Sequence, residues 1–270
     1  YYYEADGVFL FASELKAILP HPAFKKELYK PAVSQFFTFG YLHAPDTIFK
    51  NCNKIRPGHY LQINLKTREL RTSCYWNIFS FYNKPPLDIS YEEAQKTLIS
   101  LFQSAFQYRM VSDVPVGIFL SGGYDSSLVT AFLQHQSSTP LHTFTIGFKE
   151  KEEDETASAE AVAKLLGTNH TSRVCRIEDA IELIPTLPDV YDEPLMDHSV
   201  LPSLLVSKLA RSKVTVALSA DAGDELFAGY TTYDYLLHFS RITRLIPKGL
   251  LKAGSYLLQA FPSAFLSILS

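Results

Sequence analysis

One stretch of the chain decides the fold: Val114-Pro115-Val116-Gly117-Ile118-Phe119-Leu120-Ser121-Gly122-Gly123-Tyr124-Asp125-Ser126-Ser127. The apolar run up to Leu120 predicts a buried strand, and a helix is predicted from Ser126 onward. Two glycines between them let the backbone curl so that successive N–H groups face one concavity, and the helix N-terminus adds partial positive charge. We therefore expect residues 121–127 to bind a phosphate or pyrophosphate. No lysine follows as in GxxxxGK[ST], which disfavours transfer of a γ-phosphate.

Strands and helices alternate on either side of this stretch. Further strands are predicted at residues 141–148, 170–177 and 214–218, and helices at 91–110, 155–166 and 199–211. Ser90 and Glu93 predict a capping box at the first of these helices, and Ser199 is predicted to cap the last. The alternation implies an α/β fold with a parallel, doubly wound sheet. Its chemistry is expected at the carboxyl ends of the strands, in the loops after Leu120, Phe148 and Leu218.

The first part of the chain has another pattern. Asp6-Gly7 predicts a hairpin turn between strands at 1–4 and 8–12, followed by a short helix that ends at Pro20 and a strand at 60–65. This is typical of the end of an α+β unit. Asn83-Lys84-Pro85-Pro86 then separates the two patterns. We expect one domain at residues 1–80, a linker at 81–86 and a second domain at 87–270.

Composition excludes several classes of partner. The 270 residues carry 25 basic and 28 acidic side chains, for a net charge of -3, so neither nucleic acid nor an anionic membrane is expected as a partner. Cys52, Cys74 and Cys175 are odd in number and contain no CxxC pair, which favours reduced thiols in a cytoplasmic protein. Residues 253–270 are uncharged, but a glycine, a glutamine, a proline and four serines argue against a membrane span.

Several motifs together resemble one family. SGGxDS after an apolar strand is similar to the pyrophosphate-binding loop of the ATP pyrophosphatases, and residues 218–230, LSADAGDELFAGY, resemble the LSGxGxDELFxGY signature of glutamine-hydrolysing asparagine synthetases. Residues 191–194 (YDEP) and 143–148 (TFTIGF) match two further segments of that family. Residues 11–17 and 57–60 resemble the end of its N-terminal amidotransferase domain. The chain thus resembles an internal fragment of such a synthetase.

The resemblance implies ATP and Mg²⁺ as cofactors and small molecules as partners. The positions implied to bind ATP are Leu120, Ser121, Gly122, Gly123, Asp125, Ser126, Ile146, Ser219 and Ala220. Asp125 and Asp224 are expected to hold Mg²⁺, which takes oxygen ligands from one or two carboxylates and from phosphates. Two alternatives stay open: Asp125 only caps its helix, and Ile146 is only a core residue. The family prefers glycine at the position of Ala220.

Asp221 is the expected catalytic residue. It stands where asparagine synthetases usually carry a Glu that helps to deprotonate the attacking ammonia, and Asp is one methylene shorter. A displacement of about 1 Å costs on the order of 100-fold when a reacting group must be positioned. An alternative is that Asp221 only accepts backbone hydrogen bonds. This departure, and the lack of an arginine in residues 196–199, leave the acceptor open between aspartate and another carboxylate, such as a uronic acid of a surface polysaccharide.

The expected reaction is amide formation through an acyl-adenylate, with ammonia supplied from glutamine. Ring closure of the β-lactam synthetase kind and a non-catalytic ATP-binding module are the alternatives, and a homodimer is possible. The chain starts at Tyr1 and not at Met, so we expect the native N-terminus, with the catalytic cysteine of the family, to lie upstream. This fragment is therefore not expected to hydrolyse glutamine. A lysine from the family's C-terminal part would lie beyond Ser270.

Overall fold

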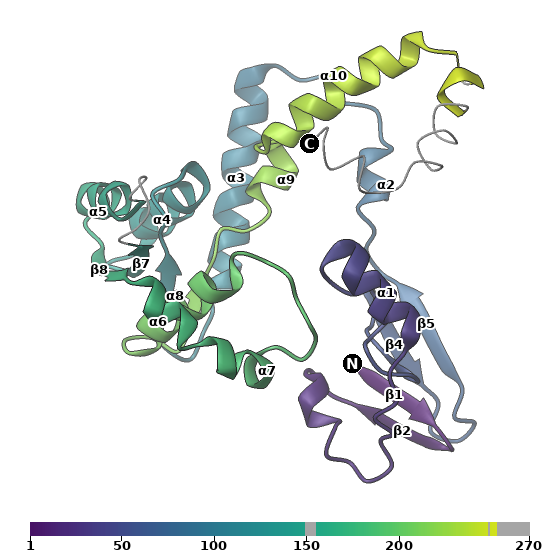
Figure 1. The fold of residues 1–270 in the computed structure, drawn as a ribbon. Helices are drawn as coiled ribbons and strands as arrows, with labels where there is room; N and C mark the ends of the chain where they lie inside the picture. Colours follow the sequence, from purple (N-terminus) through teal and green to yellow (C-terminus); the bar gives the residue numbers. More distant parts are fainter. Residues whose placement is uncertain (149–154, 248, 253–270) are drawn as a thin grey trace.

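The computed structural model describes residues 1–148, 155–247 and 249–252. The stretch 253–270, for which a membrane span was considered, lies outside these residues. Figure 1 shows two parts, an N-terminal part built on antiparallel strands and a larger part with helices around a parallel sheet. Among the described helices, none combines the length and the apolar character needed to cross a bilayer.

The parallel sheet has four strands in the order β8-β7-β6-β9. They are β6 (Val116–Phe119), β7 (His142–Phe148), β8 (Asn169–Cys175) and β9 (Val216–Leu218). Every pairing is parallel, which confirms the predicted sheet. The chain adds β7 and β8 on one side of β6 and then returns to place β9 on the other side. The direction of winding therefore reverses between β6 and β9, where sheets of this kind bind their ligands.

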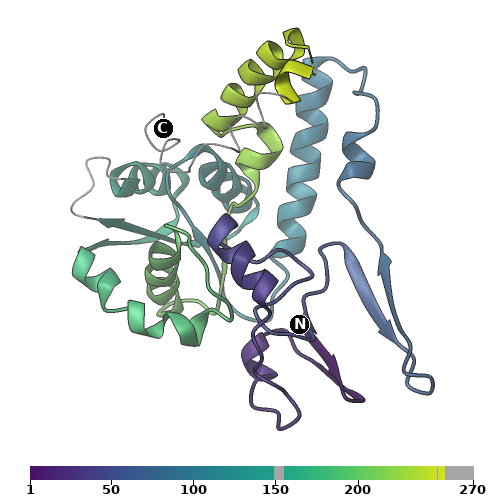
Figure 2. The same cartoon turned by 45° about the vertical axis from the view of Figure 1, so that its right-hand side comes forward.

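Helices cover both faces of this sheet (Figures 1 and 2). On one face lie α4 (Tyr124–Gln136) and α5 (Glu155–Leu166), and on the other lies α8 (Val200–Arg211). Ile118 packs against Leu133 of α4, whereas Phe144 of β7 packs on the opposite face against Ala210 of α8. The long helix α3 (Tyr91–Arg109) covers α4 through the ring of Phe102. The doubly wound architecture is confirmed.

The two predicted helix caps differ in outcome. At α3 the capping box is present, because Glu93 N donates to Ser90 Oγ at 3.2 Å and Ser90 N donates to Glu93 Oε2 at 2.9 Å. At α8 the predicted cap is wrong: the Ser199 side chain makes no capping bond, since its backbone is already helical with φ −78° and ψ −12°. Its amide instead donates to Asp197 Oδ1 at 2.7 Å, and this hydrogen bond is the main reason why the pKa of Asp197 is lowered.

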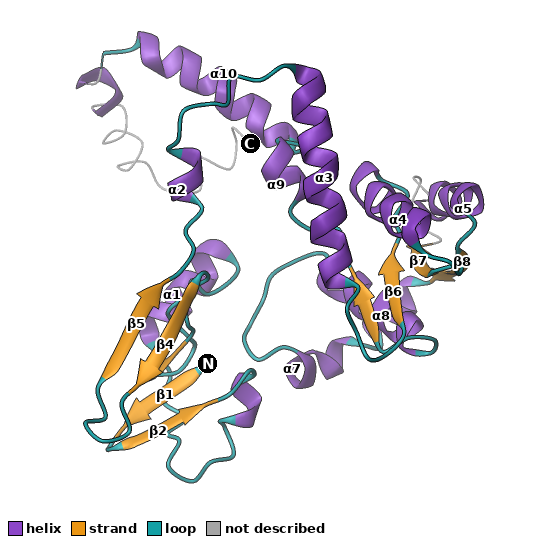
Figure 3. Cartoon of the chain, turned by 180° about the vertical axis from the view of Figure 1, so that it is seen from behind, coloured by secondary structure: helices purple, strands orange, loops and turns teal. Residues whose placement is uncertain are grey.

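The N-terminal part contains two antiparallel sheets (Figure 3). One has the order β2-β1-β3, from β1 (Tyr2–Ala5), β2 (Val8–Phe11) and β3 (Cys52–Asn53), and the other pairs β4 (His59–Ile63) with β5 (Leu70–Cys74). The turn at Asp6-Gly7 is confirmed, with φ of 51° and 76°. The buried core of the N-terminal part consists of Tyr3, Leu15, Ile18, Phe24 and Cys52. Cys52 and Cys175 are buried, Cys74 is exposed, and all three are free thiols.

Several helices were not predicted. The longest of them in the N-terminal part is α1 (Lys30–Phe39), whose signals were Pro31 in the first turn and Gly40 with φ 78° at its end. The predicted short helix is the 3-10 helix η1 (Leu15–Ala17), and α2 (Phe79–Tyr82) ends inside the predicted linker. The other unpredicted helices are α6 (Ile177–Ile181), η2 (Ile184–Thr186), α7 (Leu187–Val190), α9 (Gly223–Phe227) and α10 (Thr231–Leu245), and strands β3 and β5 were not predicted either.

His170 on β8 makes the stability of the domain with the parallel sheet depend on pH. Its Nδ1 lies 2.9 Å from Thr143 Oγ1, while its Nε2 is buried with no hydrogen-bond partner among the described residues. Burial lowers the pKa of His170 below 6.5, and Glu160 opposes this shift. The unfolded chain therefore binds a proton that the folded chain does not, so stability is lost as the pH falls through 6.5.

We expect His170→Asn, which keeps an acceptor for Thr143, to reduce the decrease in the free energy of unfolding as the pH falls. Urea unfolding at about pH 7.5 and 5.5 measures it, because both pH values lie within about one unit of the reference pKa of histidine. His135→Asn, at an exposed position of α4, is the matched control and should keep the wild-type loss. An equal loss in wild type and His170→Asn would contradict the prediction.

Candidate active site

The loops after β6 and β9 meet over one cavity of about 630 Å³ at the point where the winding of the sheet reverses. Ten of the eleven sequence-predicted site residues line it: Leu120, Ser121, Gly123, Asp125, Ser126, Ile146, Ser219, Ala220, Asp221 and Asp224. Gly122 is the exception. It has φ +81°, and a β-carbon there would lie 2.7 Å from the backbone nitrogen of Ala159. Gly122 therefore turns the backbone closely past α5 and does not face the cavity.

The loop after β6 is held by hydrogen bonds of its own hydroxyl groups. Ser121 N donates to Ser126 Oγ at 3.1 Å, and the two hydroxyls are 2.9 Å apart. Gly123 N donates to Ser121 Oγ at 3.3 Å. At the base of the loop, Thr145 Oγ1 donates to the carbonyl of Leu120. These hydrogen bonds stabilise the curled conformation of the loop.

The first turn of α4 presents backbone donors. Ser127 N donates to Gly123 O at 3.1 Å, but the amides of Tyr124, Asp125 and Ser126 donate to no acceptor among the described residues. Such amides, together with the helix dipole, favour an anion at this end of the helix. Gly123 occupies the cap position and α4 has no side-chain cap. The alternative that Asp125 only caps its helix therefore has no support.

Two glycines allow the acidic side chains of the site to approach the second loop. A β-carbon on Gly223 would overlap Oδ2 of Asp125 and would lie 2.8 Å from Oδ1, so the Asp125 carboxylate lies directly against residue 223. In the same way, a β-carbon on Gly229 would overlap Oδ1 of Asp224. The loop after β6 therefore fits into the loop after β9, which brings Asp125 next to the segment that carries Asp224.

Asp221 and Ile146 can be compared with the alternatives that the sequence left open. The exposed Asp221 lines the cavity, and its carboxylate accepts no hydrogen bond from a described residue. The alternative in which Asp221 only accepts backbone hydrogen bonds is thus not supported. Ile146 both lines the cavity and packs against the cluster of Cys175, Ala180 and Leu205, so its position fits both readings.

Short α9 is flanked by two residues in the left-handed region. Ala222 has φ 73° and Ala228 has φ 56°. Left-handed backbone costs an L-residue about 1–2 kcal/mol because the β-carbon crowds the following carbonyl. Ala222 occupies the second glycine of the LSGxGxDELFxGY pattern, so the strain explains why that pattern has glycine there.

Ala222→Gly is expected to stabilise the protein by about 0.5–1 kcal/mol, because relief of this strain exceeds the entropic cost of a glycine. Thermal or urea unfolding measures the change. Ala220→Gly is the matched control: its φ is not positive, so the same substitution two residues away should be neutral or destabilising. Equal effects of the two substitutions would show that the backbone of Ala222 is not strained.

One wall of the cavity was missed by the sequence analysis. Pro202, Ser203 and Val206 project from α8, which crosses a face of the sheet. Parallel sheets bind ligands at the carboxyl ends of their strands, and this rule does not indicate which helix residues reach the cavity. The spacing of residues 202 and 206 does place them on one face of α8. The other unpredicted lining residues are Phe119, Tyr124, Phe144, Thr145, Glu155, Gly223, Phe227 and Gly229. Of these, Phe227 contacts Phe102 of α3, with ring centroids 6.1 Å apart.

The charge of the cavity is one-sided. Asp125, Glu155, Asp221 and Asp224 line it, whereas no Lys, Arg or His is among its described lining residues. A triphosphate would be repelled here unless backbone amides and a cation balanced its charge. Asp125 and Asp224 suit Mg²⁺, because this ion usually takes one or two carboxylates and completes its shell with water and phosphate. No group of three His, Cys, Asp or Glu side chains within the described ranges forms a closed metal site.

Comparison with known proteins agrees with this geometry. The family model described as asparagine synthase matches residues 97–267, and the glutamine amidotransferase domain model matches residues 1–76. The chain belongs to the asparagine synthase family. The two matched ranges lie on either side of the predicted linker at residues 81–86.

Curated relatives cover most of the chain. One is "Putative asparagine synthetase 2, glutamine-hydrolyzing" of Methanocaldococcus jannaschii, 40% identical over 95% of this chain and 49% of its own length. Two Bacillus subtilis glutamine-hydrolyzing asparagine synthetases, numbers 3 and 1, are 33% and 30% identical over 85% and 97% of this chain, and over 39% and 40% of their own lengths. The chain thus spans half or less of these relatives.

A solved structure aligns more weakly. The ammonia-dependent NAD synthetase of Campylobacter jejuni is 14% identical, with a TM-score of 0.34 over 67% of this chain and 92% of that one. Similarity at this level supports no statement about function.

Proposed function

We propose that the intact protein is an ATP-dependent ligase that makes asparagine from aspartate, with glutamine as the source of ammonia. The observation that carries the proposal is the fit of the Asp125 carboxylate against Gly223, which joins the anion-binding loop to the acidic loop over one cavity. The side-chain carboxylate of aspartate attacks the α-phosphorus of ATP, and pyrophosphate leaves. Ammonia then attacks the acyl carbon of the adenylate, loses a proton and displaces AMP.

The loop after β6 binds the leaving pyrophosphate in this proposal. The free amides of Tyr124, Asp125 and Ser126 and the hydroxyl of Ser121 donate to its oxygens. Leu120, Ile146, Ser219 and Ala220 also line the cavity and contact the adenosine part. Gly122 contributes by turning the backbone, as its position against α5 requires.

Asp125 and Asp224 are the residues that would hold Mg²⁺, and the acidic, lysine-free lining of the cavity supports this. When bound, the ion neutralises phosphate charge and orients the triphosphate for displacement at the α-phosphorus. Without a cation the two carboxylates would repel the same oxygens. The charge balance of the cavity therefore favours MgATP over free ATP.

Asp221 accepts the proton from the attacking ammonia. It faces the cavity without a hydrogen bond from a described residue, so its carboxylate is free to act as a general base. Relatives named as asparagine synthetases favour aspartate as the acceptor over a uronic acid or an intramolecular ring closure. The match of residues 1–76 to a glutamine amidotransferase domain supports glutamine as the ammonia source. Three free thiols fit a cytoplasmic enzyme.

Exchange of labelled pyrophosphate into ATP by the intact protein tests the proposal. Aspartate should support exchange, whereas a uronic acid in its place should not, because the adenylate forms reversibly only with the correct acceptor. Ammonia and aspartate together should then yield asparagine and AMP in equal amounts. The absence of exchange with every acid offered would reject the ligase.

A further inference from the structure

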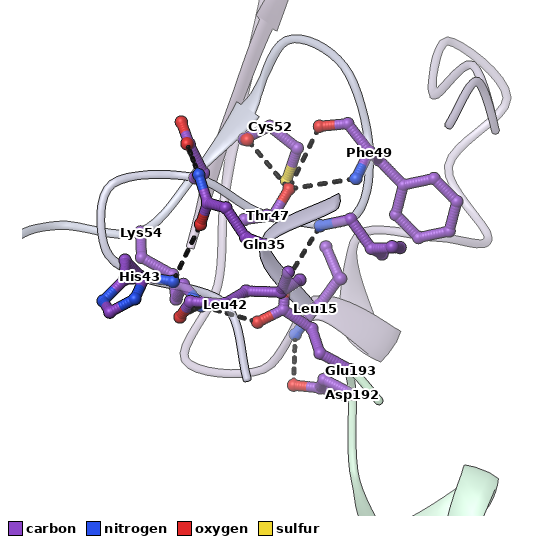
Figure 4. A network of polar contacts seen from close by, with 12 residues as sticks. Leu15, Gln35, Leu42, His43, Thr47, Phe49, Cys52, Lys54, Asp192 and Glu193 are labelled. Atoms are coloured by element: carbon purple, nitrogen blue, oxygen red, sulfur yellow. Dashed lines mark hydrogen bonds and ion pairs between the residues drawn. The ribbon is translucent and has the colours of Figure 1, made fainter. Parts of the chain in front are cut away.

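Two motifs that the active site does not use contact each other. Residues 11–17 lie in the N-terminal part and residues 191–194 (YDEP) lie between α7 and α8. Figure 4 shows Asp192 directed toward Leu15 and Glu193 toward Lys54. Among the described residues, all hydrogen bonds between residues 1–76 and the synthetase part involve residues 189–196. This short segment therefore connects the two parts of the protein.

The first half of the contact is a mutual capping of two helix ends. Leu15 N donates to Asp192 Oδ2 at 2.7 Å and Lys16 N donates to Oδ1 at 3.1 Å, so the carboxylate caps the start of η1. In return, Lys16 Nζ donates to the carbonyls of Asp189 and Val190 at 2.9 Å each, at the end of α7. Each part thus satisfies backbone groups that the other part leaves unpaired.

The second half centres on Glu193. Its Oε1 accepts from Ile48 N at 2.9 Å, and its Oε2 lies 2.7 Å from Lys54 Nζ. Lys54 also donates to Leu42 O at 2.9 Å. The side chains of Glu193 and Lys54 are only 11% and 21% exposed, so this pair is shielded from water and its loss leaves a buried charge unpaired.

The contact continues into the cavity wall. Met196 N donates to Gly40 O at 2.8 Å, at the end of α1. Four residues later α8 begins, and its Pro202, Ser203 and Val206 line the cavity. A segment docked on the N-terminal part therefore leads directly into one side of the active site.

We propose that Asp192 and Glu193 are positioning residues that dock the amidotransferase part onto the α8 side of the cavity. They touch no reacting group. That this docking serves the transfer of ammonia from the amidotransferase part to the cavity rests on the proposed function, whereas the docking itself does not. Since α8 is also packed on Phe144 of the sheet, loss of the dock should leave the ATP site formed but the amidotransferase part misplaced.

Hydrogen exchange of the intact protein tests the dock without any activity. Asp192→Asn should speed exchange at the amides of Leu15 and Lys16 by about tenfold or more, and Glu193→Gln should do so at Ile48, because each loses a charged acceptor. Asp6→Asn is the matched control, since it breaks the exposed Lys25–Asp6 pair, and it should change none of these amides. Unchanged exchange in both variants would overturn the proposal.

A second measurement separates positioning from a merely structural role. In Glu193→Gln, glutamine-dependent asparagine synthesis should fall by about tenfold or more, while ammonia-dependent synthesis stays within about twofold. Lys54→Met should give the same split, and the double variant should be little worse than either single variant. An equal fall of both activities would contradict the positioning role. If wild type makes no asparagine from ammonia, the proposed function fails, and the exchange experiment still decides the dock.

Discussion

Asp125→Asn is expected to lower pyrophosphate–ATP exchange by about 100- to 1,000-fold, the size seen when one electrostatic contact to a reacting group is removed. The carboxylate lies against Gly223, where the two loops meet, and the cavity has no cationic side chain that could replace a lost metal ligand. The amide is nearly the same size, so the fold should persist. Initial rates with labelled pyrophosphate, ATP and aspartate measure the loss.

Glu155→Gln is the matched control for this experiment. It also removes a carboxylate from the cavity lining, but Glu155 begins α5 and takes no part in the fit of the two loops. Exchange should stay within about tenfold of wild type, since the variant loses only the electrostatic effect of one nearby charge, which solvent weakens. Equal losses in the two variants would show that only the overall negative charge matters, and would remove Asp125 as a specific ligand.

Gly223→Ala tests the contact between Asp125 and Gly223 by adding a methyl group and leaving every charge in place. The new β-carbon would overlap the Asp125 carboxylate, which must rotate away. Exchange should fall in the same direction as in Asp125→Asn, although every charge is retained.

The meeting of the two loops was predictable because it depends on few long-range facts. Apolar runs ending at Leu120 and Leu218 predict parallel strands, and parallel strands place their carboxyl ends at one edge. Asp125 and Asp224 follow these ends, so their approach needs only the correct strand order. The individual residues were implied by the resemblance to the family motifs, and ten of them line the cavity.

What the sequence did not predict depends on packing between distant segments. The Leu15 amide and the Asp192 carboxylate are 177 residues apart, and no periodicity relates them. The cavity wall on α8 depends on how that helix crosses the sheet. Gly122 carries the motif spacing of a ligand-binding residue, but its orientation is set by the approach of α5. In each case the local pattern predicts the element, whereas tertiary packing decides what each residue contacts.

Asp221→Ala is expected to separate the two chemical steps. Amide formation should fall by about 100- to 10,000-fold, the usual contribution of a general base, because ammonia must lose a proton as it attacks. Pyrophosphate exchange should stay within about threefold, since adenylate formation needs no base for ammonia and Asp221 accepts no hydrogen bond that holds its loop. Parallel measurement of asparagine formation and exchange gives the ratio.

Asp221→Glu is the informative companion. It restores the residue that asparagine synthetases usually carry and extends the carboxylate by one methylene into the cavity. If the surrounding loop is built for Asp, the longer side chain misplaces the base by about 1 Å and amide formation falls by on the order of 100-fold. We expect that fall, because Ala220 and Ala222 replace both glycines beside Asp221, and their β-carbons alter the backbone that carries it. Full activity of Asp221→Glu would mean that the position of the base is loosely defined, and that the shorter Asp has no compensating change around it.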